Sequence, residues 1–165
     1  LEIINLYNFM GYLVEITNLK ETFKHFEKRT KYEIRKCGKE VSITTAIARL
    51  DYFHQLSRPD RKINLAYIKK VFLEKSPNVR IYQTDTAAAM FSWQGKTAIY
   101  LLAGRDKTKK SDGSPSKIIW QAIQDFNKLG IKQLDLSGAN KPSIALFKRG
   151  FGGKLVEQKK FYLKY

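Results

Sequence analysis

The residues best suited to chemistry lie near the end of the chain, in the stretch from Ser143 to Gly153. A cationic pair, Lys148 and Arg149, stands there among apolar residues, and three glycines follow within four positions. A cation beside a glycine turn can bind phosphate or stabilise a developing oxyanion, because glycine lets a ligand or another backbone come close. The alternative is a helix end capped by glycine, with Lys148 an exposed charge near the helix dipole.

A second candidate is the polar loop from Gly104 to Lys117, which joins an apolar run to an expected helix N-terminus. The free amides and the dipole of such a terminus favour an anion. The GxxxxGK[ST] spacing of a P-loop is absent, and a solvated loop is the alternative. Mobile cations along the loop would add to a phosphate site; they are Arg105, Lys107, Lys109, Lys110 and Lys117.

Other catalytic arrangements find little support. With only His25, His54 and Cys37 available, the sequence shows no metal-ligand cluster and no Ser-His-Asp or Cys-His pairing. Carboxylates are scarce, which disfavours a glycosidase-like acid and base pair. We interpret the basic helix from Lys24 to Lys39 as a solvated face, with nucleic-acid binding left open.

The elements that must position these residues follow from hydrophobic periodicity and from turn residues. Thr17 or Asn18 is expected to cap the first helix. Ser114 with Pro115 is expected to begin a later amphipathic helix, and Gly130 to end it. This order predicts an α/β (α+β) fold with a mixed central sheet flanked by helices. The expected strands cover 7–16, 41–46, 79–85, 86–93, 96–103, 132–137 and 154–165, and the expected helices cover 19–38, 48–56, 65–75, 114–129 and a short segment after 138.

Composition limits the class of protein. The 165 residues suit one domain or one and a fraction, and the 43% hydrophobic content is enough for a core. The formal net charge of +16 predicts a polyanionic partner such as nucleic acid or nucleotide phosphates, although a lysine-rich composition alone is the alternative. A single Cys37 and the absence of a signal-peptide pattern predict a cytoplasmic protein, and no apolar run reaches the roughly 20 residues of a membrane span.

Three runs of the sequence resemble the C-terminal lobe of FemAB-like proteins, which are relatives of the GNAT acyltransferases. These runs are TAIYLLAGRD, IIWQAIQDFNKLGIKQLDLSGA and IALFKRGFGGKLV. The run KRTKYEIRKCGKEVSI is similar to the segment that introduces this lobe. The resemblance extends over most of the chain, from Tyr12 onward.

The resemblance implies a GNAT-like fold, in which a splayed sheet holds the acyl donor. It implies that residues 41–165 form the acyltransferase domain and that residues 1–40 are a lead-in or the tail of a preceding lobe. The chain is then expected to be the second lobe of a longer protein or a shortened stand-alone member. The best-known members transfer an amino acid from aminoacyl-tRNA to an amine of a peptidoglycan precursor and require no cofactor.

The resemblance also implies residue roles. Phe147 and Lys148 match a phenylalanine–lysine pair near the donor site, and Lys148 is the expected cation at the oxyanion. Arg61 matches an arginine that contacts the nucleotide diphosphate of the acceptor, and Tyr100 matches a tyrosine near the acceptor. The expected catalytic residues are Lys148 and Phe147, no metal is expected, and the expected substrate-binding residues are Arg61, Tyr100, Arg105, Lys107, Lys110, Arg149, Gly150 and Gly152.

Two other functions stay open. A CoA-dependent N-acetyltransferase would take acyl-CoA as its donor, although the RxxGxG/A signature of CoA-binding relatives is absent from the loop after Ala103. A non-catalytic RNA-binding module would keep the fold and the basic surface. The sequence shows no general base, which the substrate or a further lobe would have to supply.

Overall fold

The computed structural model describes residues 2–70, 74 and 76–164, and it describes side chains from residue 8 to residue 159 outside that gap. The strands are β1 (Glu2–Glu15), β2 (Ser42–Thr44), β3 (Val79–Gln83), β4 (Ala87–Gln94), β5 (Thr97–Arg105), β6 (Gln133–Gly138) and β7 (Lys154–Lys164). The helices are α1 (Leu19–His25), α2 (Lys28–Lys36), α3 (Ala48–Ser57), α4 (Leu65–Ile68), α5 (Ser114–Lys128) and α6 (Pro142–Arg149).

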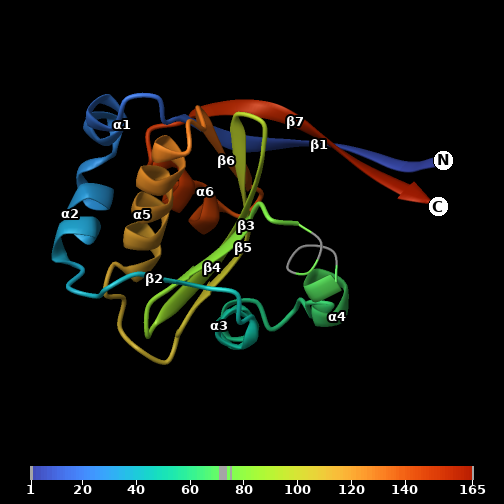
Figure 1. Cartoon of the computed structure of the whole chain (residues 1–165), viewed down its shortest axis with the longest axis horizontal. Helices are drawn as coiled ribbons and strands as arrows, with labels where there is room; N and C mark the ends of the chain where they lie inside the picture. The colour runs from blue at the N-terminus through green and yellow to red at the C-terminus, as the bar shows by residue number, and fades with distance from the viewer. Residues whose placement is uncertain (1, 71–73, 75, 165) are drawn as a thin grey trace.

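The strands form one mixed sheet in the order β2-β3-β4-β5-β6-β1-β7, which confirms the predicted α/β class with a mixed central sheet (Figure 1). Only β5 and β6 run parallel, and the other neighbouring pairs are antiparallel. A parallel pair needs a long crossover, and α5 supplies it. The pairing of the sheet therefore changes from antiparallel to parallel at its centre, between β5 and β6.

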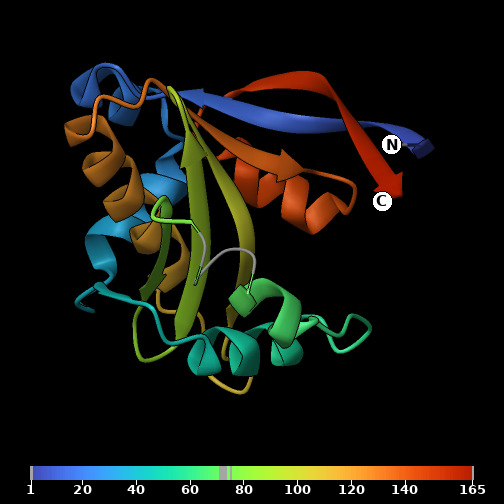
Figure 2. The same cartoon turned by 45° about the vertical axis from the view of Figure 1, so that its right-hand side comes forward.

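Helices cover the sheet in two groups with separate cores (Figures 1 and 2). The larger core joins α1, α2 and α5 to the sheet, and Phe26, Phe126 and Phe151 are almost wholly buried in it. The smaller core lies under α3 and α4 and is built on Leu50, Phe53 and neighbouring apolar side chains. Residues 100 and 101 of β5 fall on different sides, because successive side chains of a strand point to opposite faces.

The first strand belongs to the same sheet as the rest of the chain. β1 lies between β6 and β7 and pairs with β7 along most of its length, and the two termini end side by side (Figure 1). The division of the chain into residues 1–40 and 41–165 stays a prediction. Within the described residues, however, the first segment supplies an inner strand.

The expected single helix over 19–38 is wrong, since α1 and α2 are separate. Phe26 adopts an extended conformation, and the Glu27 amide donates to the Gly150 carbonyl oxygen at 2.8 Å. The Phe26 ring packs edge-on against Phe151, with ring centroids 5.2 Å apart. The break is therefore made by the segment that follows α6, more than a hundred residues away, which the helical periodicity cannot reveal.

Two other expected boundaries shift. The expected helix over 65–75 is described as the short α4, and part of that range lies outside the described residues. The expected cap of α5 is wrong by one residue: Gly113 is the N-cap, and Ser114 is already helical. Asn18 caps α1 as expected, since its side chain accepts from the Glu21 amide. Gly130 ends α5 with a φ of 74°.

Candidate active site

The candidate site lies where β5 and β6 separate. Their parallel ladder covers only three pairs, from Thr97 with Gln133 to Ile99 with Asp135. β5 then continues along β4 while β6 continues along β1, so the two strands diverge (Figure 2). Diverging strands leave backbone groups unpaired at the centre of the sheet, and other groups have to satisfy them.

Lys148, from α6, reaches this divergence. Its side chain is buried, with 6% of the residue exposed, and its Nζ donates to the Gly138 carbonyl oxygen at 2.6 Å. Nζ also lies 5.5 Å from the centroid of the Tyr100 ring, an arrangement that favours a cation. Burial lowers the pKa of Lys148 to about 8, and the negative charge of Asp135 acts in the opposite direction. The alternative of an exposed helix-end charge is therefore wrong.

Ser137 connects the two diverging strands. Its hydroxyl donates to the Tyr100 carbonyl oxygen at 3.0 Å, and its amide donates to Asp135 Oδ1 at 2.7 Å. Its φ of 60° is the one positive φ angle found at a non-glycine residue in the described chain. Such a conformation persists only where the surroundings impose it, and it is found often at functional sites.

Sequence reasoning missed Asp135, Ser137 and Gly138 as site residues. The run Asp-Leu-Ser-Gly contains a signal, because an aspartate two residues before a serine can accept from its amide and bend the backbone. That signal was masked by the apolar alternation, which predicts a regular strand. Gly11 of β1 completes the bend, since a Cβ there would lie 2.8 Å from the Ser137 carbonyl oxygen.

The structure also brings Phe147 and Tyr100 to this part of the core. Phe147 is partly buried and packs edge-on against Phe151, with centroids 5.5 Å apart. The Tyr100 ring lies 5.4 Å from Phe91, and burial raises the pKa of Tyr100. Lys148 thus sits in a largely apolar setting in which an ammonium is poorly solvated.

Arg149, Gly150 and Gly152 of the glycine motif lie against α1, α2 and the break between them. Arg149 pairs with Glu27 at 2.9 Å on the surface. A Cβ on Gly150 would collide with the Thr30 hydroxyl, and a Cβ on Gly152, where φ is 67°, would collide with the His25 carbonyl. These glycines allow close packing of the chain on the break between α1 and α2. The predicted role of Arg149, Gly150 and Gly152 in substrate binding stays a prediction.

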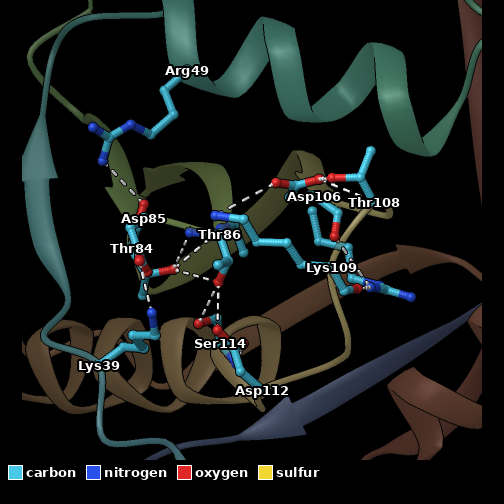
Figure 3. Close-up of polar contacts among 12 residues, drawn as sticks. Lys39, Arg49, Thr84, Asp85, Thr86, Asp106, Thr108, Lys109, Asp112 and Ser114 are labelled. Carbon is cyan, nitrogen blue, oxygen red and sulfur yellow. Dashed lines mark hydrogen bonds and ion pairs between the residues drawn. The ribbon is translucent and has the colours of Figure 1, made fainter.

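The N-terminus of α5 is occupied by a carboxylate of the chain itself (Figure 3). Asp112 accepts from the Ser114 amide at 2.9 Å and from the Thr86 hydroxyl at 2.7 Å. Burial would raise the pKa of Asp112, but the hydrogen bonds from Thr86 and Ser114 outweigh it and lower the pKa. Pro115 offers no amide, so a phosphate at this terminus would have to displace Asp112.

Gly113 closes the same terminus from the other side. Its φ is 82°, and a Cβ there would collide with the Glu33 carbonyl of α2. The backbone of α2 therefore lies against the first turn of α5. A ligand of any size would meet protein there, and the prediction of an open anion site at these amides loses its main support.

The cations of the loop are spread over its surface. Arg105 donates to the carbonyls of Asp106 and Lys109, and Lys107 donates to the Ser57 carbonyl of α3 at 3.2 Å. Lys110 is exposed. The role of Arg105, Lys107 and Lys110 in substrate binding stays a prediction, and none of them contacts the groups around Lys148 in the described structure.

Arg61 lies elsewhere, between α3 and α4, where it lines a pocket over the smaller core. That pocket borders Leu101 and Leu102 of β5, whereas Tyr100 belongs to the larger core. The structure therefore joins Tyr100, Phe147 and Lys148 in one region and leaves Arg61 in another. The predicted contact between Arg61 and an acceptor stays a prediction.

Two further observations bear on the kind of site. Among the described residues, no three side chains of His, Cys, Asp or Glu gather in a group that could hold a metal ion. None of the helices seen in the described part of the chain has the length and apolar character needed to cross a membrane.

Comparison with known proteins gives matches at the level of structure. No family model matches the sequence, and no curated protein matches it. The crystal structure of FemX matches with a TM-score of 0.78 at 9% identity, over 94% of this chain and 61% of that chain.

Two further solved structures also match. The C-terminal domain of a putative enzyme from Agrobacterium fabrum has a TM-score of 0.64 at 14% identity, over 94% of this chain and 60% of that chain. The structure of L-PGS from Bacillus licheniformis has a TM-score of 0.56 at 11% identity, over 96% and 61%.

This chain spans about three fifths of the length of each of these structures. At such low identity the likeness concerns the fold alone. The chain thus has the Fem-like variant of the GNAT fold that the sequence resemblance indicates, with Lys148 buried at its divergent centre.

Proposed function

We propose that this chain is the transferase domain of a Fem-type aminoacyltransferase, which moves an aminoacyl group from aminoacyl-tRNA to an amine acceptor such as a peptidoglycan precursor. The observation that carries the proposal is the buried ammonium of Lys148 at the divergence of β5 and β6. Burying a cation costs free energy unless a partner compensates its charge or the charge serves a function. Lys148 has only one hydrogen-bond acceptor among the described groups.

In the proposed reaction the acceptor amine attacks the carbonyl carbon of the aminoacyl ester. The tetrahedral intermediate carries its negative charge on the former carbonyl oxygen. Lys148 has three N–H donors, of which the Gly138 carbonyl takes one, so two remain for that oxygen. The ester C–O bond then breaks, and the leaving hydroxyl takes the proton that the amine gives up.

The surroundings of Lys148 suit this role. The kinked backbone at Ser137 and Gly138 fixes the position of the ammonium before substrate arrives. A charge that is already in position stabilises an oxyanion most strongly in a poorly solvated site. With a pKa of about 8, Lys148 is mainly protonated near neutral pH. Phe147 supplies part of the apolar setting.

The choice of a tRNA donor over acyl-CoA rests on two observations. The α5 terminus, where a pyrophosphate would gain most from free amides, is filled by Asp112 and covered by α2. The net charge of +16 suits a large polyanion. Acyl-CoA remains the alternative donor, and a non-catalytic RNA-binding module remains the alternative of another class.

The test is transfer from labelled aminoacyl-tRNA to amine acceptors, a peptidoglycan precursor among them, with labelled acetyl-CoA as a parallel donor. We expect transfer from the tRNA only, and loss of about a hundredfold in rate for Lys148→Ala. Arg149→Ala, which removes the neighbouring surface cation, is the comparison variant and should lower the rate less than Lys148→Ala does. Transfer from acetyl-CoA alone would replace the proposal by its alternative, and tRNA binding without transfer would favour the RNA-binding module.

A further inference from the structure

A carboxylate lies at the point where β5 and β6 separate. Asp135 of β6 forms the last pair of the parallel ladder, opposite Ile99 of β5. Beyond this pair β5 follows β4 and β6 follows β1 (Figure 2). Asp135 therefore stands at the start of the same divergence that the Lys148 ammonium reaches.

The carboxylate and the ammonium come to the divergence from different faces of the sheet. Leu134 and Leu136 are buried in the larger core, so the Asp135 side chain between them points to the opposite face. Lys148 places its Nζ 5.5 Å from the centroid of the Tyr100 ring, which packs against the larger core. A group bound in the divergence can therefore have a carboxylate on one side and an ammonium on the other.

Only one oxygen of Asp135 is used by the fold. Oδ1 accepts from the Ser137 amide at 2.7 Å, and Oδ2 has no hydrogen-bond partner among the described groups. Asp135 is half-buried, and the only fully enclosed side-chain polar atom without a partner in the described residues is Nδ1 of His54. It follows that Oδ2 of Asp135 is accessible, and that the bond to Ser137 fixes its direction.

Asp135 and Lys148 act on each other without pairing. The negative charge of Asp135 favours the charged form of Lys148, yet no ion pair joins the two side chains in the described part of the chain. Each is held by the backbone of one short bend, Asp135 by the Ser137 amide and Lys148 by the Gly138 carbonyl. Two opposite charges that the backbone holds apart are the arrangement that a reaction with a base and an oxyanion requires.

We propose that Asp135 is the general base of the transfer and that its Oδ2 accepts a hydrogen bond from the attacking amine. As the C–N bond forms, the amine proton passes to Oδ2, and the negative charge develops on the former carbonyl oxygen, which faces Lys148. When the bond to the leaving group breaks, Oδ2 gives the proton to the leaving atom and is a carboxylate again. The inference rests on the proposed acyl transfer, but it holds for a tRNA ester and for a CoA thioester alike.

The primary experiment measures kcat and KM for transfer to the peptidoglycan precursor and to hydroxylamine. Asp135→Asn keeps an acceptor for the Ser137 amide but cannot take up the proton. With the precursor amine, kcat should fall about a hundredfold or more, as the loss of a general base does, and KM should change far less. With hydroxylamine the loss should be much smaller, because its nitrogen gives up a proton more readily.

Asp125→Asn is the matched control. It removes the charge of another half-buried aspartate, which accepts from the Tyr82 hydroxyl on α5 and lies outside the site. Its rates with both acceptors should stay within about twofold of the native ones. Urea denaturation of both variants shows whether either loss is one of folding.

A measurement on the native chain does not depend on how the variants fold. Nα-acetyl-lysine amide, added without an acyl donor, should shift the carboxyl-carbon resonance of Asp135. Nα-acetyl-norleucine amide, which has the same chain without the amine, should not shift it. The two amides therefore separate contact with an amine from contact with an apolar chain.

Three outcomes would overturn the inference and leave the proposed function standing. In the first, Asp135→Asn transfers to the precursor amine at the native rate. In the second, it loses as much with hydroxylamine as with the precursor, which would restrict Asp135 to supporting the bend at Ser137. In the third, the Asp135 resonance responds equally to the two amides. Absence of transfer by the native chain from either donor would instead remove the proposed function, and this inference with it.

Discussion

The hydroxyl of Ser137 donates a 3.0 Å hydrogen bond to the Tyr100 carbonyl oxygen, across the gap where β5 and β6 have stopped pairing. The Ser137 side chain thus takes the place of a backbone hydrogen bond that the diverging strands no longer form. The next residue, Gly138, then offers its carbonyl to Lys148. The divergence of the sheet and the placement of the candidate catalytic cation are therefore held by one short segment of β6.

Replacing Ser137 by alanine tests this arrangement. We expect the free energy of unfolding to fall by about 1–2 kcal/mol, because the Tyr100 carbonyl loses a partner. The transfer rate should fall by more than the loss of stability alone explains, because the Gly138 carbonyl that accepts from Lys148 is no longer fixed in position. Urea denaturation and transfer kinetics measure the two effects. Ser92→Ala, on β4, is a control, and equal behaviour of both variants would remove Ser137 from the site.

The buried state of Lys148 predicts a pH dependence of stability. Its pKa is about 8 in the folded chain and 10.5 as the reference for an unfolded one. Between these values the unfolded state binds more protons, so the free energy of unfolding should rise with pH in this window. Urea denaturation of the native chain and of Lys148→Met at a series of pH values isolates this contribution. A constant difference between the two curves from pH 8 to pH 10.5 would contradict it.

Turnover should change in the opposite direction over the same window. If the ammonium stabilises the oxyanion, the rate falls as pH rises through about 8, while the folded state becomes more stable. Rates measured with a fixed donor and acceptor, corrected for the titration of the acceptor amine, give this profile. A rate that continues to rise above this pH would identify neutral Lys148 as a base instead.

Gly152 and Gly95 form a matched pair for testing the glycine motif. Both have positive φ, 67° and 58°, but a Cβ would collide with the His25 carbonyl only at Gly152. Gly95→Ala should cost about 1 kcal/mol from its conformation alone. Gly152→Ala should cost about 3 kcal/mol, because the overpacking adds to the strain. Equal losses in urea denaturation, with a large rise in KM for Gly152→Ala, would favour the predicted substrate-binding role.

Asp112 should stabilise the chain above acidic pH. Its pKa is lowered from the reference value of 3.8, so its contribution is fully present above that value and is lost as pH falls through the folded pKa. Asp112→Ala should cost about 1 kcal/mol near neutral pH, because the Ser114 amide and the Thr86 hydroxyl lose their acceptor. The difference from the native chain should shrink below pH 3.8. A difference that is independent of pH would show that packing, and not charge, is responsible.

Binding of tRNA should fall steeply with salt. Each neutralised phosphate contributes a slope of about 0.7–0.9 in a plot of log affinity against log salt. The variant Lys107→Ala/Lys109→Ala/Lys110→Ala should reduce that slope if the loop contacts the backbone. The control variant Lys96→Ala/Lys128→Ala/Lys132→Ala removes three exposed lysines near the other end of α5. A slope that neither variant changes would place the contact away from both regions.

The sequence by itself determined what depends on neighbours along the chain. The amphipathic spacing from Ile119 to Phe126 predicts α5, the Asn18 cap predicts the start of α1, and the net charge predicts a polyanionic partner. The FKRGFGG motif directs attention to Lys148, whose burial the structure then shows. These features arise from propensity, capping and charge, which act within a few residues or over the whole surface.

Only the tertiary structure decided the features that join distant segments. The break between α1 and α2 depends on the Gly150 carbonyl, and the burial of Lys148 depends on Gly138 and Tyr100. The closed terminus of α5 depends on Glu33 of α2. Each contact forms between residues that local pattern cannot relate. The physical reason is that backbone groups left unpaired by the diverging strands and helix ends must find partners wherever folding brings them.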